Sequence, residues 1–176
     1  MHTEISKKGE KVIIYTDRSG IDGKVGAAAV VKATREHRHC QMGTEQDSTV
    51  YSAELRAVEM ALEMVQDGPE RARKGVVVFS NSQAALQALV RPRMPSGQVY
   101  LRGCVQSLQH LHKQGIRVEF RWIPAHQGIP GNELVDEHAK QAAKAEIAGP
   151  HDRNIKLAAA AKRGIRERAK FAWEAA

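Results

Sequence analysis

Apolar residues at the start of the chain fall into short runs separated by turn-forming residues. The run KVIIYTD, Lys11 to Asp17, is rich in β-branched and aromatic residues and is closed by the turn-rich segment RSGIDGK. A second apolar run, Val25 to Lys32, and a polar segment around Arg38 to Met42 follow. Three such runs joined by short turns predict an antiparallel meander of three strands.

Helical periodicity replaces the strand pattern after this meander. Four apolar side chains recur at helical spacing: Leu55, Val58, Leu62 and Val65. They predict an amphipathic helix over residues 52–66 that packs on the sheet, with Ser52 as its N-cap. Gly68 and Pro69 end this helix.

Strand and helix patterns alternate in the rest of the domain. Val76 to Phe79 is an unbroken apolar strand, and helices are predicted over Ser82 to Val90 and about residues 98–114. A strand over Ile116 to Ile123 and a helix that begins after Gly131 complete the pattern. Alternation after a meander predicts a mixed α/β sheet, in which helical crossovers make the later strands parallel to the first.

The C-terminal segment differs in composition from the rest of the chain. The length of 176 residues allows one ordinary domain and an extension. Residues 149–176 are rich in Ala and hold seven basic and three acidic side chains, which is +4 of the total charge of +7. We therefore expect one domain over residues 1–148, followed by a basic helical extension over residues 149–176. A basic excess of this size indicates a polyanionic partner.

The composition excludes several classes of protein. The chain is 42% hydrophobic and 27% charged, which is typical of a globular protein. It has no run near the roughly 20 apolar residues that cross a bilayer and no secretory pattern at its start. Cys40 and Cys104 lie far apart in the sequence, so we expect two buried thiols rather than a disulfide or zinc site. An intracellular setting, cytoplasm or nucleus, without membrane contact is predicted.

Polar side chains follow two of the predicted buried strands. Asp17 ends the first strand, and Asn81 ends the strand that begins at Val76. Because ligands bind at the carboxyl ends of parallel strands, these two side chains are placed to face each other. Glu54, in the first turn of its helix, and Asp136, one turn into the last helix, can reach the same spot.

Three convergent carboxylates repel one another unless a cation neutralises them. Hard oxygen ligands at this charge density suit Mg²⁺ or Mn²⁺. A pair of such ions about 4 Å apart can activate a water and stabilise the leaving oxygen of a displacement at phosphorus. An acid at a strand end is more often a turn former than a ligand, so spacing alone leaves both interpretations open.

Four blocks of the sequence carry a family resemblance in their order and spacing. The blocks are YTDRSG at 15–20, YSAELRAVEMAL at 51–62, FSNSQAAL at 79–86 and WIPAHQGIPGNELVDEHAK at 122–140. Over about residues 10–147 the chain resembles the ribonuclease H domain, in a form similar to the domain of fungal non-LTR retrotransposon reverse transcriptases. The resemblance implies an α/β fold with a five-stranded sheet in the order 3-2-1-4-5, its first three strands antiparallel, flanked by helices. It also implies endonucleolytic cleavage of the RNA strand of RNA/DNA hybrids by two-metal catalysis.

The resemblance assigns roles to individual residues. Asp17, Glu54 and Asp136 match three of four metal-binding carboxylates, which would hold two Mg²⁺ ions, with Mn²⁺ as a substitute. His126 matches a catalytic-site histidine on a flexible loop, where it can relay a proton or assist product release. The residues implied to contact the nucleic acid are Arg18, Ser19, Gly20, Ser82, Gln83 and Asn132. The implied partner is an RNA/DNA hybrid, and we expect a monomer that is part of a larger reverse transcriptase polyprotein.

Two positions depart from the family pattern. Asn81 stands where the family has its remaining carboxylate; Asn is nearly isosteric with Asp but neutral, so metal ligation and catalysis should suffer while the fold survives. Arg18 replaces the usual Gly after the first Asp. Two explanations of Asn81 stay open: a deliberate change that traps a nuclease on its substrate, and the natural divergence that Arg18 favours.

Three functions are therefore compatible with the sequence. The first is a ribonuclease H, an enzyme by family, that is impaired at Asn81. The second is a non-catalytic nucleic-acid-binding or scaffold domain of the same fold. The third is a protein-interaction module whose basic C-terminal segment docks on an acidic partner.

Two further histidines share one face of a predicted strand. His37 and His39 are two residues apart, so their side chains point to the same side. Without a third ligand this pair indicates surface residues rather than a zinc site. His110 and His112 lie on a predicted helix at a spacing that does not share a face, so they do not indicate chelation either.

Overall fold

The computed structural model describes residues 11–45, 48–91 and 98–145 of the chain. Its elements, in chain order, are β1 (Val12–Ile21), β2 (Lys24–Val31), β3 (His37–Thr44), α2 (Val50–Asp67), the 3₁₀ helix η1 (Pro69–Ala72), β4 (Val76–Ser80), α3 (Gln83–Val90), α4 (Gln98–Lys113), β5 (Val118–Trp122) and α5 (Pro130–Lys144). The five strands form one sheet in the order β3-β2-β1-β4-β5. Strands β1, β2 and β3 are antiparallel, while β4 and β5 run parallel to β1. The predicted α/β sheet is confirmed.

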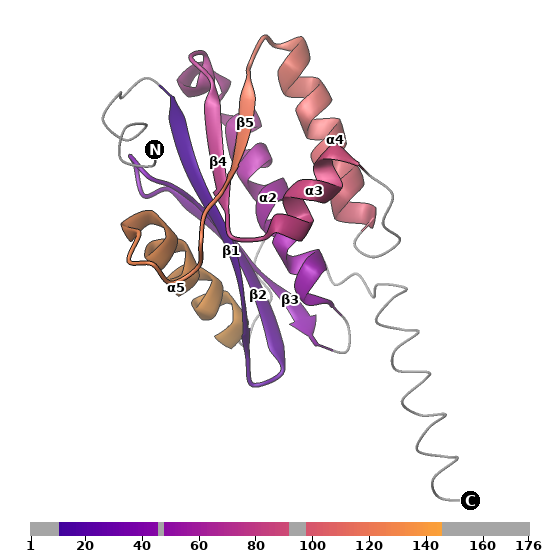
Figure 1. The fold of residues 1–176 in the computed structure, drawn as a ribbon, viewed down its shortest axis with the longest axis vertical. Helices are drawn as coiled ribbons and strands as arrows, with labels where there is room; N and C mark the ends of the chain where they lie inside the picture. Colours follow the sequence, from indigo (N-terminus) through magenta and orange to yellow (C-terminus); the bar gives the residue numbers. More distant parts are fainter. Residues whose placement is uncertain (1–10, 46–47, 92–97, 146–176) are drawn as a thin grey trace, which may run out of the picture.

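Helices cover both faces of this sheet (Figure 1). Helix α5 lies on one face, and α2, α3 and α4 lie on the other. Consecutive residues of β1 enter the two cores in turn, because successive side chains of a strand point to opposite faces. Ile13 and Tyr15 pack in the core under α5, whereas Ile14 packs in the core under α2. Burial on both faces is the physical reason for the unbroken apolar runs of the central strands.

Helix α2 is the most deeply buried of the described helices, because the sheet covers one side of it and α4 packs on the other. All four side chains of the predicted apolar face are buried: Leu55, Val58, Leu62 and Val65. The sequence predicts Ser52 as the N-cap, but the N-cap in the structure is Thr49. Thr49 Oγ1 accepts from the Ser52 N–H at 3.1 Å, and Ser52 Oγ accepts from the Thr49 N–H at 3.0 Å. Two hydroxyl residues three positions apart can exchange these bonds, so the helix begins earlier and Glu54 lies in its second turn.

Strand β1 is longer than predicted. The sequence placed its end at Asp17, whereas β1 continues to Ile21 by pairing with β2. Its parallel pairing with β4, however, ends at Thr16, which lies opposite Ser80. The prediction that the strand ends at Asp17 was therefore wrong, because β1 stays paired with β2 beyond this residue. Asp17 is nevertheless the first residue after the β1–β4 ladder.

Two glycines allow α5 to lie close to the sheet. A Cβ atom on Gly26 of β2 would stand 2.3 Å from the Ala139 carbonyl oxygen of α5. A Cβ atom on Gly131 of α5 would stand 2.2 Å from Cε2 of Tyr15. Since real atoms do not approach so closely, a side chain at either position would push α5, and with it Asp136, away from the sheet.

The remaining sequence predictions have mixed outcomes. Strand β5 is shorter than the predicted span of residues 116–123. Cys40 and Cys104 are buried thiols, as expected. The predicted basic extension, residues 149–176, lies outside the described residues, and the domain boundary stays a prediction. Within the described ranges, no helix combines the length and apolar character needed to cross a membrane.

Candidate active site

Asp17 and Asn81 lie side by side at the carboxyl edge of strands β1 and β4. Each follows the last residue through which these two strands pair. Asn81 Nδ2 donates a hydrogen bond to Asp17 Oδ1 over 3.0 Å, and the Arg18 backbone N–H donates to the same oxygen over 2.7 Å. The Trp122 indole N–H of β5 donates to the Asn81 carbonyl oxygen at 3.1 Å, which holds the backbone at this edge. The juxtaposition expected from the two strand ends is present.

Glu54 and Asp136 approach this edge from opposite faces of the sheet. Glu54 comes from α2 and Asp136 from α5, and their exposed fractions are only 7% and 8%. Both carboxylates interact electrostatically with Asp17, which is 4% exposed. Within the described part of the chain, no three acidic groups bring an oxygen each within 4.8 Å of one another. The acids are thus neighbours around Asp17 without meeting at one point.

Burial makes the ionised form of these acids costly. Desolvation raises the pKa of Asp17, and the charge of Asp136 adds to the rise, while hydrogen bonds from Arg18 and Asn81 oppose it. Desolvation, followed by the charge of Asp17, raises the pKa of Glu54 to about 7. A cation bound here would relieve both the desolvation cost and the repulsion between the acids.

Two cationic side chains contact the acids in the metal-free protein. Arg18 Nε lies 3.3 Å from Glu54 Oε1, and Lys140 Nζ lies 2.6 Å from Asp136 Oδ2. Neither pair was predicted from the sequence. The four-residue spacing of Asp136 and Lys140 on one helix could have indicated the second pair. The first could not be anticipated, because it joins residues 36 positions apart.

The donor atoms of this cluster suit a hard divalent cation. Asp17, Glu54 and Asp136 supply carboxylate oxygens, and Asn81 supplies an amide oxygen, which Mg²⁺ and Mn²⁺ accept. Glu54 Oε2 is buried and has no hydrogen-bond partner in the described structure. A buried carboxylate oxygen without a partner is unfavourable, and metal ligation would satisfy it. The residues therefore fit such an ion, provided that Arg18 releases Glu54.

His126 lies in the loop between β5 and α5, and Asn132 lies at the start of α5. His126 is exposed and has a positive φ of 53°, in the loop before α5. Asn132 is in the first turn of α5 and is only 1% exposed. Its Oδ1 atom is buried without a hydrogen-bond partner among the described residues. In this conformation Asn132 faces the protein interior, while His126 is accessible from solvent.

The other residues predicted to contact nucleic acid directly follow Asp17 or Asn81 along the chain. Arg18 is partly buried, Ser19 is 6% exposed and Gly20 is exposed, all on β1. Ser82 is the N-cap of α3, where its hydroxyl accepts from the Ala85 N–H over 3.3 Å. Gln83 is exposed in the first turn of α3. Their contact with nucleic acid stays a prediction, as do the metal-binding and catalytic roles.

A sequence profile of a known family matches most of this chain. The profile is that of RNase H, and it matches residues 9–144. Because the match covers most of the chain, the protein belongs to the ribonuclease H family and is a ribonuclease H by family. The α/β fold that this family implies is the fold observed.

Relatives with this similarity occur in viruses and bacteria. The Pol polyprotein of caprine arthritis encephalitis virus (strain Cork) is 30% identical over 130 residues, which is 72% of this chain and 10% of the polyprotein. The Pol polyprotein of equine infectious anemia virus (isolate 1369) is 30% identical over 135 residues, 73% of this chain and 10% of that protein. The ribonuclease H of Xanthomonas axonopodis pv. citri (strain 306) is 28% identical over 151 residues, 80% of this chain and 97% of the bacterial protein. The chain thus spans about a tenth of the viral polyproteins it matches.

Solved structures share the fold at lower sequence identity. Ribonuclease H1 of Halobacterium salinarum is 19% identical with a TM-score of 0.54, over 75% of this chain and 96% of that one. A foamy viral protease-reverse transcriptase in complex with RNA/DNA hybrid is 18% identical with a TM-score of 0.60, over 77% of this chain and 20% of that one. At these identities the likeness concerns the fold.

Proposed function

We propose that this domain binds RNA/DNA hybrids and hydrolyses the RNA strand endonucleolytically with two divalent ions, at a rate lowered by Asn81. The observation that supports the proposal best is the buried group of Asp17, Glu54 and Asp136 around Asn81 at the carboxyl edge of the sheet. The foamy viral relative of the same fold is in complex with an RNA/DNA hybrid, which supports this choice of substrate.

The metal ions would be held by Asp17, Glu54, Asp136 and, through its amide oxygen, Asn81. Mg²⁺, or Mn²⁺ in its place, would supply an activated water and stabilise the leaving oxygen of a displacement at phosphorus. Asp17 takes the central position, because both other acids and the Asn81 amide interact with it. Asn81 orients Asp17 through its hydrogen bond but contributes no charge, which lowers metal affinity and the rate.

His126 and the exposed residues around the acids would act on the substrate side. Histidine exchanges protons near neutral pH, so an exposed His126 is suited to relay a proton or to assist product release. Gly20 and Gln83 offer polar backbone and side-chain atoms on either side of the cluster. Contacts of this kind recognise phosphates and 2′-hydroxyls in the minor groove without reading sequence.

We also retain the wider setting predicted from the sequence. The domain would end near residue 148, and the basic segment 149–176 would add electrostatic attraction for nucleic acid. Similarity to viral Pol polyproteins supports a place within a larger reverse transcriptase polyprotein. The origin in a fungal non-LTR retrotransposon, the monomeric state and the intracellular setting stay predictions.

A second candidate function is a non-catalytic domain that binds the same hybrid. It is favoured by two observations at one place: Asn81 is neutral, and the Arg18 guanidinium contacts the Glu54 carboxylate that a metal ion would need. In such a domain the fold and the substrate surface persist, while the metal chemistry is lost.

One experiment separates these functions. Hybrid binding of the full chain is measured in EDTA, and cleavage of a labelled hybrid is measured in Mg²⁺ and in Mn²⁺, with double-stranded DNA as the control substrate. The enzyme binds and cleaves, the non-catalytic domain only binds, and a protein-interaction module does neither. An Asp17→Asn variant is the matched control for contaminating nuclease, because cleavage that persists in it does not come from this site.

A further inference from the structure

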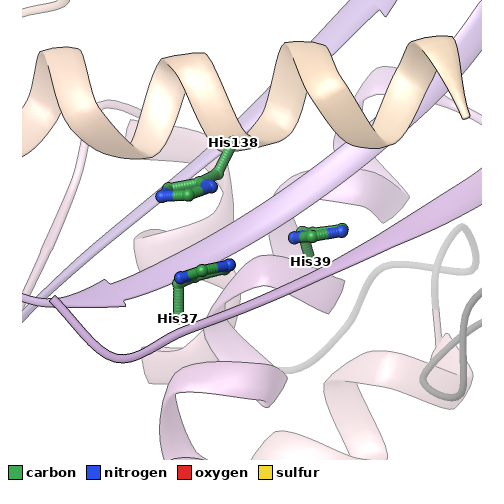
Figure 2. A group of neighbouring side chains, drawn as sticks. All are labelled: His37, His39 and His138. Carbon is green, nitrogen blue, oxygen red and sulfur yellow. The ribbon is translucent and has the colours of Figure 1, made fainter.

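Edge strand β3 presents two histidines to helix α5. His37 and His39 point toward α5, whereas the alternate residues point toward α2: Arg38 pairs with Glu63 at 3.7 Å, and Cys40 packs in the core under α2. Helix α5 places His138 directly above this pair (Figure 2). The structure thus supplies the third histidine that the sequence pattern of His37 and His39 lacked.

The three imidazole rings are close and nearly parallel. The ring centroids of His37 and His138 lie 3.8 Å apart with 17° between the ring planes. His39 lies 5.5 Å from His37 and 6.2 Å from His138 by the same measure. One ligand nitrogen from each ring lies within 4.8 Å of the other two. This distance is short enough for one ion to be shared after a modest rearrangement.

Backbone packing holds the rings together. Gly26 of β2 has no side chain, so α5 lies against the sheet where a Cβ atom would be 2.3 Å from the Ala139 carbonyl oxygen. Gln41 of β3 donates from Nε2 to the Ala145 carbonyl oxygen, at the end of α5, over 2.7 Å. Both contacts hold α5 against the sheet next to the histidine group, and neither depends on the rings.

Hydrogen bonding at His37 and His138 leaves ring nitrogens available to a metal ion. His37 Nδ1 lies 3.3 Å from the Arg35 carbonyl oxygen, which can only accept, so Nδ1 is the donor and Nε2 is the nitrogen that the neutral ring offers to a metal ion. His138 Nδ1 is buried and has no hydrogen-bond partner among the described residues. Neutral imidazole is the form that ligates metals.

We propose that His37, His39 and His138 form a binding site for a divalent first-row transition metal ion, with Zn²⁺ as the best fit, between β3 and α5. Imidazole nitrogens prefer Zn²⁺ and its neighbours to Mg²⁺, which requires oxygen ligands. The site is therefore distinct in chemistry from the Asp17 cluster. Three histidines leave the fourth tetrahedral position to water, and His37 is exposed enough to admit it.

The adjustment needed to close the site is small. Nitrogens on a tetrahedral zinc ion, each about 2.0 Å from the metal, stand about 3.3 Å apart. The side-chain torsion that turns a histidine ring is soft, so ring rotation can bring the nitrogens to this distance. A bound ion would join the edge strand to the helix that carries Asp136, two residues before His138, and would stabilise the folded domain.

The test is a calorimetric titration of the full chain with ZnCl₂ in the presence of excess Mg²⁺, which occupies the acidic cluster. The variants are His138→Ala and His37→Ala, and the control is His112→Ala, an exposed histidine on α4. Loss of even an outer partner of a metal ligand costs about 10- to 100-fold in affinity, so losing a ligand should cost at least as much. The control should bind Zn²⁺ like the parent protein.

A thermal melt provides the second measurement. Zn²⁺ should raise the melting temperature of the parent and of His112→Ala, and should not raise that of either cluster variant. Because His37 is exposed, His37→Ala keeps the test valid if His138→Ala does not fold. Equal Zn²⁺ affinity in the parent and in His37→Ala would overturn the proposal. It would also be overturned if His112→Ala weakened Zn²⁺ binding as much as the cluster variants do.

Discussion

Replacing Asn81 by Asp tests the geometry at the centre of the acidic cluster. Asn81 Nδ2 donates to Asp17 Oδ1 over 3.0 Å, and Asp17 is only 4% exposed. Asn81→Asp removes the donor and places a second carboxylate against the first, where little water screens the repulsion. In the absence of metal, the variant should therefore be less stable than the parent.

The size of the loss can be worked from this contact. Two unit charges about 4 Å apart repel by about 4 kcal/mol at an effective dielectric constant near 20, and the lost hydrogen bond adds about 1 kcal/mol. One carboxyl group can escape part of this cost by taking up a proton, so we expect a loss of about 2 to 4 kcal/mol in the free energy of unfolding. For a chain of this size the melting temperature should fall by about 4 to 16 °C.

The assay is a thermal melt in EDTA at several pH values. Repulsion raises the pKa of the paired carboxyl groups in the folded state above the unfolded value. The loss of stability in the variant is therefore fully present at pH values above the folded pKa. It should disappear below about pH 4, where both groups are protonated in either state. Gln83→Glu, which adds the same charge at an exposed position nearby, is the matched control. If Asn81→Asp is as stable as the parent at pH 8, the two side chains do not face each other and the site geometry is wrong.

The same variant should gain activity. A restored carboxylate ligand is expected to recover about 3 to 6 kcal/mol of transition-state stabilisation, or about 10²- to 10⁴-fold in Mg²⁺-dependent hybrid cleavage. Added Mg²⁺ should also stabilise the variant more than the parent, because the folded variant should bind Mg²⁺ more tightly than the folded parent does. If the variant is less stable but does not cleave the hybrid, the result supports the site geometry and favours the non-catalytic function.

Three further changes probe the surroundings of the cluster. In EDTA, stability should fall as the pH rises from about 4.5 through 7, because burial and Asp17 raise the pKa of Glu54 to about 7 from 4.5; Glu54→Gln should remove this fall in pH-dependent melts. Arg18→Ala frees Glu54 from its ion pair, which is partly exposed, so calorimetry should show Mg²⁺ affinity raised about 2- to 5-fold. Gly131→Ala should cost about 1 to 3 kcal/mol in denaturant unfolding, because its Cβ would meet the Tyr15 ring, whereas Gly20→Ala should cost less.

The mixed α/β sheet could be predicted because its elements have distinct periods, whereas its strand order came from the family resemblance. The central strands are apolar on both faces, and the four large apolar side chains predicted for α2 recur at helical spacing and are buried. The errors lie at element ends. Thr49 and Ser52 offer the same capping chemistry, and β1 continues past Asp17 through residues that otherwise favour a turn. Pairing with β2 outweighs that local preference, and pairing cannot be read from the residues of one strand.

The site could be predicted only where backbone topology decides it. Asp17 and Asn81 end up adjacent because the β1–β4 ladder stops just before both residues. The contact between Arg18 and Glu54 depends instead on how far a flexible side chain reaches from β1 to α2. The approach of His138 to His37 depends on how closely α5 packs, which Gly26 permits. Distances between separate elements of this kind have no signature in local sequence.

Arg18 and Asn81 both make the acidic cluster less negative than the family pattern would. The family pattern has four carboxylates here, whereas this chain has three, with a guanidinium on one of them. Each change lowers the repulsion that a metal ion would relieve, so we expect each to stabilise the protein without metal and to weaken metal binding. If this reasoning holds, Mg²⁺ affinity should increase from the parent through either single variant, Arg18→Ala or Asn81→Asp, to the double variant. Because both act on the charge around Asp17 and Glu54, their effects on affinity should be coupled rather than additive.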